Sequence, residues 1–308
     1  LVAVSRLILN LLTLRILAEH ILRNLVKAVT FVGTTGVGKQ VYSKAAAHGK
    51  RVQAQCEAKN HALVLEDCNL EATVNAIINS TYGCAGMRCM ALPVVCVQES
   101  IADEFVSLLK KKAEAMKLGC AYDEDTDLGP VVNAGHKEKI CNWIQKGIDE
   151  GAELVLDGRN AVVPGYENGF FVGPTILDHV TPEMTVGNRE IFGPVTCIKR
   201  VKDYEEGIAV MNANPFANGS CIFTQSGYYS RKFAMETDGG MVGINVGIPV
   251  PTAYFPFSGN KDSFFGDLHV LGKDGYRFFT RAKTVTTHWF DEAAGKRKVG
   301  TWEGSTEA

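Results

Sequence analysis

The sequence has little net charge. Its 32 Lys and Arg residues nearly balance its 34 Asp and Glu residues, which gives a formal net charge of −2. This balance provides no electrostatic case for nucleic acid or an anionic membrane as a partner. The uncharged run at residues 7–14 is also far shorter than the roughly 20 apolar residues that a membrane span needs. We therefore expect neither partner.

Regular cysteine spacing is also lacking. The nine cysteines are odd in number and scattered, no two have CxxC spacing, and no His-rich segment accompanies them. A secreted disulfide scaffold would be smaller and more regular, and a zinc site would need closer ligands. We expect a reducing intracellular compartment and no metal site.

The first 25 residues are rich in Leu and carry Arg6, Arg15 and Arg23. They lack the small-residue cleavage pattern of a secretory signal. An amphipathic transit peptide and a buried helix both stay open, and we favour the buried helix. Because the first residue is Leu rather than Met, the sequence is compatible with a fragment of a longer chain.

Strand and helix patterns alternate along most of the chain. Short apolar runs predict strands, and helical spacing such as that of Phe105, Leu109 and Met116 predicts helices. This alternation is typical of an α/β fold with a largely parallel sheet. From residue 249 the chain is rich in Pro, Gly and aromatics, which predicts an extended segment, and residues 283–289 alternate as a strand would. The expected strands are 27–32, 51–55, 62–65, 94–97, 154–156, 172–177, 197–201, 220–224 and 241–246, with helices ending at 47, along 101–116, along 140–151, at 204–212 and at 230–237.

A glycine-rich turn, Gly33 to Gly38, follows the first predicted strand and begins a helix. Glycines allow close backbone approach, and a helix N-terminus offers free N–H groups to phosphate. With Lys39 the spacing nearly matches a P-loop, but Gln40 stands where a Ser or Thr would bind magnesium. A phosphate-binding turn, a plain strand-to-helix turn and, as the weakest alternative, an ATPase remain open.

Cys89 lies among small residues and next to Arg88, in the segment GCAGMRCMA at 83–91. A single cysteine most often packs in a core. A fixed cation beside a thiol, however, favours the thiolate, which is the nucleophilic form. We therefore expect Arg88 to help ionise Cys89.

Several segments together carry a resemblance to one family. They are FVGTTGVG at 31–38, AKNH at 58–61, GMRCMAL at 86–92, DLGP at 127–130 and EIFGPV at 190–195. They occur in the order in which aldehyde dehydrogenases have them. GYENG at 165–169 and IPVP at 248–251 are similar to the methylmalonate-semialdehyde branch of that family. The resemblance extends from about residue 27 to residue 289.

The resemblance implies a thioester mechanism with Cys89 as the catalytic nucleophile and NAD as the hydride acceptor. In the methylmalonate-type branch the acyl group loses carbon dioxide and passes to coenzyme A. Arg88 matches the residue that pairs with the substrate carboxylate, with a structural salt bridge as the alternative. Glu190 matches the residue that binds the nicotinamide ribose, with a surface acid as the alternative. The other cofactor-binding residues that the resemblance implies are Gly33, Thr34, Gly38, Gln55 and Cys56.

The departures from the family pattern are informative. Gln55 stands where most aldehyde dehydrogenases have a Glu that activates water, and an amide cannot act as a base. This favours coenzyme A over water as the acyl acceptor. Glu57 replaces a Gly, and the sequence lacks the N-terminal part of the family's cofactor domain, including an oxyanion-stabilising Asn. We therefore expect the isolated chain to bind NAD poorly and to turn over slowly.

The resemblance also predicts the organisation. We expect a remnant of a Rossmann-type NAD-binding domain at 1–57, a catalytic α/β domain at 58–260, and a C-terminal segment at 261–308 with an oligomerisation strand. The expected partners are a small semialdehyde substrate and further copies of the chain, in a dimer or tetramer. A mitochondrial location is the family expectation, with the cytoplasm otherwise. The alternative function is a truncated, weakly active or inactive paralogue that pairs with intact subunits.

Overall fold

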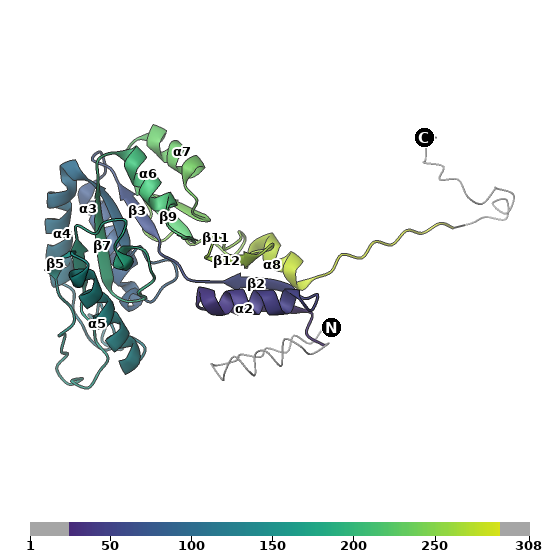
Figure 1. Cartoon of the computed structure of the whole chain (residues 1–308), viewed down its shortest axis with the longest axis horizontal. Coiled ribbons are helices and arrows are strands. Elements are labelled where there is room, and N and C mark those ends of the chain that lie inside the picture. The colour runs from purple at the N-terminus through teal and green to yellow at the C-terminus, as the bar shows by residue number, and fades with distance from the viewer. Residues whose placement is uncertain (1–24, 290–308) are drawn as a thin grey trace.

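The computed structural model describes residues 25–289, which form a large and a small sheet with helices packed on them, and a two-stranded sheet of β8 (Phe216–Ala217) and β11 (Asn260–Lys261) (Figure 1). The large sheet has seven strands in the order β10-β9-β3-β4-β7-β6-β5. Its neighbouring strands are parallel except for β5, which is antiparallel to β6. The strands are β3 (His61–Val64), β4 (Val94–Gln98), β5 (Glu153–Leu156), β6 (Thr175–Asp178), β7 (Val195–Val201), β9 (Gly219–Phe223) and β10 (Met241–Ile244).

Helices cover both faces of the large sheet, as Figure 1 shows. One face packs against α3, α4 and α5, whose apolar side chains include Ile77, Phe105 and Ile144. The other face packs against α6 and α7, through Met211 and Phe233. Both clusters are buried, so the sheet has a core on each side. The helices are α3 (Leu70–Tyr82), α4 (Ala102–Glu114), α5 (Ala134–Asp149), α6 (Tyr204–Asn212) and α7 (Gly227–Glu236).

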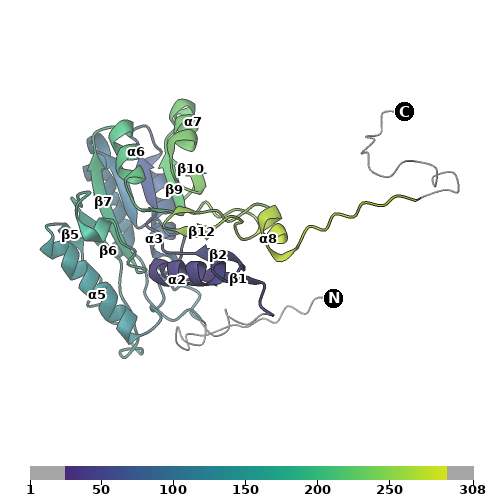
Figure 2. The same ribbon diagram turned by 45° about the vertical axis from the view of Figure 1, so that its right-hand side comes forward.

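The small sheet combines residues from the two ends of the described chain (Figure 2). β1 and β2 are parallel, and β12 pairs antiparallel with β2. Helix α2 packs on this sheet through Val41 and Ala45. The elements are β1 (Ala28–Val32), α2 (Thr35–Ala46), β2 (Arg51–Gln55) and β12 (Phe264–Gly266). Residues 264–266 of the predicted C-terminal segment therefore share a sheet with the predicted cofactor-domain remnant.

The α/β fold with a largely parallel sheet is confirmed. The strand expected at 51–55 and the helix expected at 204–212 have the predicted bounds. Helix α3 was not predicted. None of the helices described between residues 25 and 289 is long and apolar enough to cross a membrane. The N-terminal 1–24 and the last residues, 290–308, lie outside the described part, and so does most of the expected N-terminal helix.

One expectation for the C-terminal region was wrong, and the oligomerisation strand stays a prediction. The segment after residue 249 is not simply extended, because it contains β11 (Asn260–Lys261), β12 and α8 (Gly272–Phe279). Residues 283–289 do not form a strand, and all of them are exposed. In this single chain they lead away from both sheets (Figures 1 and 2), so no neighbouring strand edge completes a ladder with them.

Candidate functional site

The loop that carries Cys89 is shaped by unusual backbone conformations. Cys84 and Ala85 have positive φ values of 52° and 54°, and Gly86 has a φ of 68°. A Cβ atom at Gly86 would lie 2.1 Å from the carbonyl oxygen of Gly193. Only glycine combines this φ with so close a backbone approach. Gly86 thus lets the Cys89 loop pack directly against the segment that follows Glu190.

Two asparagines hold the backbone of the Cys89 loop. Asn60 Nδ2 donates to the carbonyl oxygens of Cys89 at 2.9 Å and Ala91 at 2.8 Å, while its Oδ1 accepts from Gly219 N at 2.9 Å. Asn218 Nδ2 also donates to the Cys89 carbonyl, at 3.0 Å. Both asparagine side chains are buried. Neither role was predicted from the sequence; Asn60 lies within the AKNH segment that carried the family resemblance, whereas Asn218 had no such signal.

The Cys89 thiol is exposed, but its pKa is raised. The surrounding protein desolvates the thiolate, which is the largest cause, and the negative charge of Glu190 adds to it. Arg88 does not counter this, because its Nε points to the sulfur of Cys84 at 3.2 Å and its Nη1 to the carbonyl oxygen of Asn79 at 3.4 Å. The expectation that Arg88 ionises Cys89 was therefore wrong for the described conformation. The thiol has to lose its proton before it can react as a nucleophile.

Glu190 is the acid whose negative charge raises the pKa of Cys89. Burial raises its pKa to about 7, and the charge of Glu57 contributes in the same direction. The backbone N–H of Ala58 donates to Glu190 Oε1 at 3.1 Å, which partly opposes the shift. Ala58 is the only donor to this carboxylate among the described residues, so the second oxygen has no hydrogen-bond donor from them. That oxygen could accept from hydroxyl groups.

The glycine turn has one face toward the interior and one toward solvent. The Gly33 N–H donates to the Gln55 carbonyl at 3.1 Å, which ties the turn to β2. Gly38 is buried, and a Cβ there would lie 2.3 Å from the sulfur of Cys56. Gly38 and Cys56 therefore pack α2 onto β2 in the described conformation, away from the exposed side of the turn. Thr34 is exposed, and its hydroxyl makes no capping hydrogen bond.

The start of helix α2 already has an anionic partner. Glu57 Oε2 accepts from the backbone N–H of Thr35 at 2.9 Å, and Thr35 Oγ1 accepts from Glu57 N at 3.3 Å. The same threonine hydroxyl donates to the carbonyl of Asp262 at 3.1 Å. A carboxylate at a helix N-terminus is stabilised by the free N–H groups and by the helix dipole. Glu57 thus caps the helix at the place where a phosphate would bind.

Residues 57–60 connect these parts. Glu57 contacts the first turn of α2, Ala58 binds Glu190, and Asn60 binds the Cys89 loop. One short segment between β2 and β3 therefore brings together the glycine turn, the acid and the nucleophile that the sequence singled out. Gln55, just before it, is buried and donates through Nε2 to the carbonyl of Phe257 at 3.2 Å.

The comparisons with known proteins agree with this arrangement. The sequence pattern of the aldehyde dehydrogenase family matches residues 6–285. The chain belongs to the aldehyde dehydrogenase family. A malonate-semialdehyde dehydrogenase of Bacillus mycoides is 51% identical over 264 residues, which are 86% of this chain and 54% of that relative. One from Geobacillus kaustophilus is 51% identical over 265 residues, again 86% and 54% of the two chains.

Solved aldehyde dehydrogenase structures show the same similarity. A methylmalonate-semialdehyde dehydrogenase from Oceanimonas doudoroffii superposes with a TM-score of 0.87 at 43% identity, over 90% of this chain and 57% of that one. A putative methylmalonate-semialdehyde dehydrogenase from Sinorhizobium meliloti, complexed with NAD, gives 0.84 at 43% identity, over 86% and 54%. The chain spans about half the length of the relatives it matches.

Membership of the aldehyde dehydrogenase family makes the P-loop ATPase hypothesis wrong. The structure gives a separate reason, because Lys39 Nζ forms an ion pair with Asp262 at 3.0 Å. A P-loop lysine would instead reach toward nucleotide phosphates. The glycine turn here belongs to an aldehyde dehydrogenase chain, and its role in binding the cofactor stays a prediction.

Proposed function

We propose that this chain carries the nucleophile half of an NAD-dependent, CoA-acylating oxidoreductase for malonate or methylmalonate semialdehyde. The observation that supports it most is the contact of residues 57–60 with α2, Glu190 and the Cys89 loop in turn. The relatives that are about 50% identical over the aligned residues are named malonate-semialdehyde dehydrogenases. The named relatives are bacterial, which gives no support to a mitochondrial location.

The chemistry centres on Cys89. Its thiolate attacks the aldehyde carbon to form a thiohemiacetal, and loss of hydride from that carbon leaves a thioester on the sulfur. The β-carboxylate of the acyl group leaves as carbon dioxide, and the thioester enolate that remains takes up a proton from water at carbon. The thiolate of coenzyme A then attacks the thioester carbonyl, takes the acyl group and releases the thiolate of Cys89. Since Gln55 cannot act as a base toward water, thiol transfer is favoured over hydrolysis. Acetyl-CoA or propionyl-CoA is the expected product.

NAD supplies the hydride acceptor when it is bound, and the described residues fit it unevenly. The open oxygen of Glu190 suits the two hydroxyls of a ribose, and the exposed Thr34 hydroxyl is free to meet a phosphate. The first backbone N–H of α2 cannot also donate to a pyrophosphate, because it already donates to the Glu57 carboxylate. The ribose end of the cofactor is therefore matched, and the phosphate end is blocked while Glu57 keeps this conformation.

Purified protein tests the proposal directly. With NAD, coenzyme A and malonate semialdehyde it should produce NADH and acetyl-CoA, and mass spectrometry should find an acyl adduct on Cys89 when coenzyme A is omitted. Cys89→Ser should abolish both, while the half-buried Cys141→Ser serves as the matched control. An adduct that persists in Cys89→Ser would refute the role of Cys89.

A second candidate function is a weakly active or inactive subunit that pairs with intact chains. The Glu57 carboxylate at the start of α2 favours it, since this residue opposes the phosphate of NAD. The exposed residues 283–289 would then pair with a strand of a neighbouring subunit, in a homo-oligomer or a mixed one. Light scattering after size exclusion should show a dimer or tetramer, and deletion of the residues from 283 onward should return it to a monomer. A monomeric full chain would contradict the pairing.

A further inference from the structure

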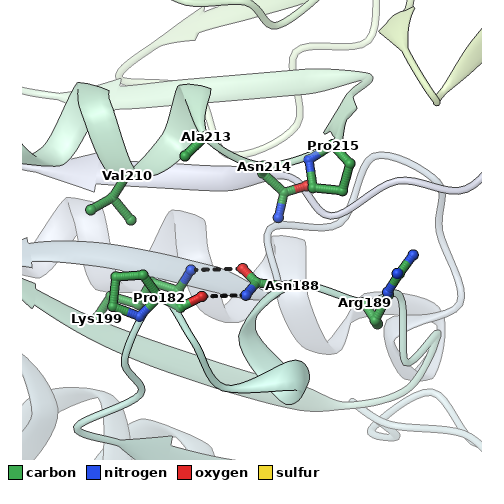
Figure 3. A pocket seen from close by; sticks show the side chains of 8 residues that line it. All are labelled: Pro182, Asn188, Arg189, Lys199, Val210, Ala213, Asn214 and Pro215. Carbon is green, nitrogen blue, oxygen red and sulfur yellow. Dashed lines mark hydrogen bonds between the residues drawn. The ribbon is translucent and has the colours of Figure 1, made fainter.

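A cavity of about 230 Å³ lies between the end of α6 and the loop that precedes Glu190 (Figure 3). Asn188, Arg189, Lys199 and Asn214 provide its polar side chains. Neither Cys89 nor the glycine turn lines it. The proposed reaction therefore gives this cavity no role.

Lys199 is a buried cation without a counterion. It lies on β7, is 3% exposed, and has no carboxylate within ion-pair distance among the described residues. Its Nζ donates to Asn188 Oδ1 at 3.3 Å and lies 3.4 Å from His61 Nε2. Burial also lowers its pKa, which reflects the cost of an ammonium group in this position.

The tautomer of His61 follows from its other contact. Its Nδ1 lies 2.7 Å from the Lys59 carbonyl oxygen, and a carbonyl can only accept. Nδ1 therefore carries the hydrogen, and Nε2 accepts from Lys199. These two acceptors use two of the three N–H groups of the Lys199 ammonium, so the third is left for the cavity.

Asn214 provides a second unused donor. It is 3% exposed, and its Oδ1 accepts from the backbone N–H of Phe216 at 2.9 Å. Its Nδ2 has no hydrogen-bond partner in the part of the chain that the structure describes. In Figure 3 this nitrogen points toward the side of the cavity where Asn188 and Lys199 lie. A buried amide donor without an acceptor is unfavourable unless a ligand or water supplies one.

The unused groups around the cavity are therefore donors and cations. The side chain of Arg189 adds a second cation to the lining. We propose that this cavity binds a small oxyanion of the phosphate or carboxylate class. The oxygen atoms of such an ion would accept from Asn214 Nδ2 and Lys199 Nζ, and its charge would neutralise Lys199.

The test uses the full chain and two probes, inorganic phosphate and acetate, titrated separately by isothermal calorimetry. The tighter of the two probes identifies the class of anion. Lys199→Met removes the buried cation at similar volume. Asn214→Asp keeps the oxygen that accepts from Phe216 N and replaces the donor with an acceptor. The exposed Lys202→Met is the matched control.

Both cavity variants should weaken binding of the preferred anion at least tenfold, and Lys202→Met should leave it unchanged. If Lys199→Met fails to fold, Asn214→Asp alone decides the outcome. No binding by the unchanged chain would overturn the proposal. Binding that survives both substitutions would show an adventitious ion only. Because the readout is binding rather than turnover, the result is independent of the role of Cys89.

Discussion

Substitution of Glu57 by Gln should tighten NAD binding. In the described conformation the Glu57 carboxylate lies 2.9 Å from the N–H of Thr35 that a phosphate would use. A phosphate beside that carboxylate would have a like charge about 4 Å away, which costs roughly 1 kcal/mol in water and about 4 kcal/mol at the effective dielectric of a protein surface. Glu57 is partly exposed, so we expect the lower part of this range to apply.

The expected change is a gain of about 1–2 kcal/mol in binding free energy, or roughly a 5- to 30-fold lower Kd for NAD. Glu57→Gln should also lower the pKa of Glu190, because the charge of Glu57 contributes to its elevation. Calorimetric titration with NAD measures the first effect. Glu104→Gln, an exposed change on α4, is the matched control. Unchanged or weaker NAD binding by Glu57→Gln would refute the argument that this carboxylate competes with the cofactor.

Three further changes test the rest of the site. Glu190→Gln should lower the pKa of Cys89, since the Glu190 charge raises it, and the pH dependence of iodoacetamide alkylation measures this; an unshifted profile would contradict the coupling. In the folded protein the pKa of Glu190 is about 7, above its ordinary value near 4.5. Ionisation of Glu190 should therefore lower the free energy of unfolding as the pH rises between these two values. Urea titrations should show a loss of up to about 3 kcal/mol relative to Glu190→Gln. Asn60→Ala removes hydrogen bonds to two carbonyls and one buried N–H, and should cost about 2–4 kcal/mol of unfolding free energy; a loss under about 1 kcal/mol would count against its role. Gly86→Ala should lower the free energy of unfolding by more than about 2 kcal/mol and slow alkylation of Cys89. Gly36→Ala is the control, since a Cβ there meets nothing within 4 Å, and it should be neutral or stabilising. Equal melting temperatures for the two variants would contradict the role of the close contact at Gly86.

The large sheet could be predicted from the sequence because its strands are buried on both faces. β4 and β7 are mostly apolar or β-branched runs bounded by turns, and such runs predict strands without knowledge of their neighbours. β12 could not be predicted in the same way, since its three residues become a strand only by pairing with β2, roughly 200 positions earlier. Residues 283–289 do not form a strand in the single chain for the related reason that alternation alone supplies no partner, so this strand stays a prediction.

The site shows the same division. Cys89 and Glu190 could be singled out because family motifs contain them, whereas only the structure shows that their loops are in contact, through Gly86 and Gly193. Asn60 and Asn218 support backbone carbonyls, a role for which the sequence carries no signal of its own. The contact between Glu57 and Thr35 spans 22 positions, so only the fold shows that the unusual residue caps the helix.

The contacts of residues 57–60 have a consequence for engineering. The small sheet carries the glycine turn, the large sheet carries both Cys89 and Glu190, and residues 57–60 are hydrogen-bonded to all three. A rotation of one sheet against the other would therefore move the thiol relative to the glycine turn. A chimera that exchanges the small-sheet unit for that of another dehydrogenase should join the two parent sequences before Glu57 or after Asn60. One parent then supplies all of residues 57–60.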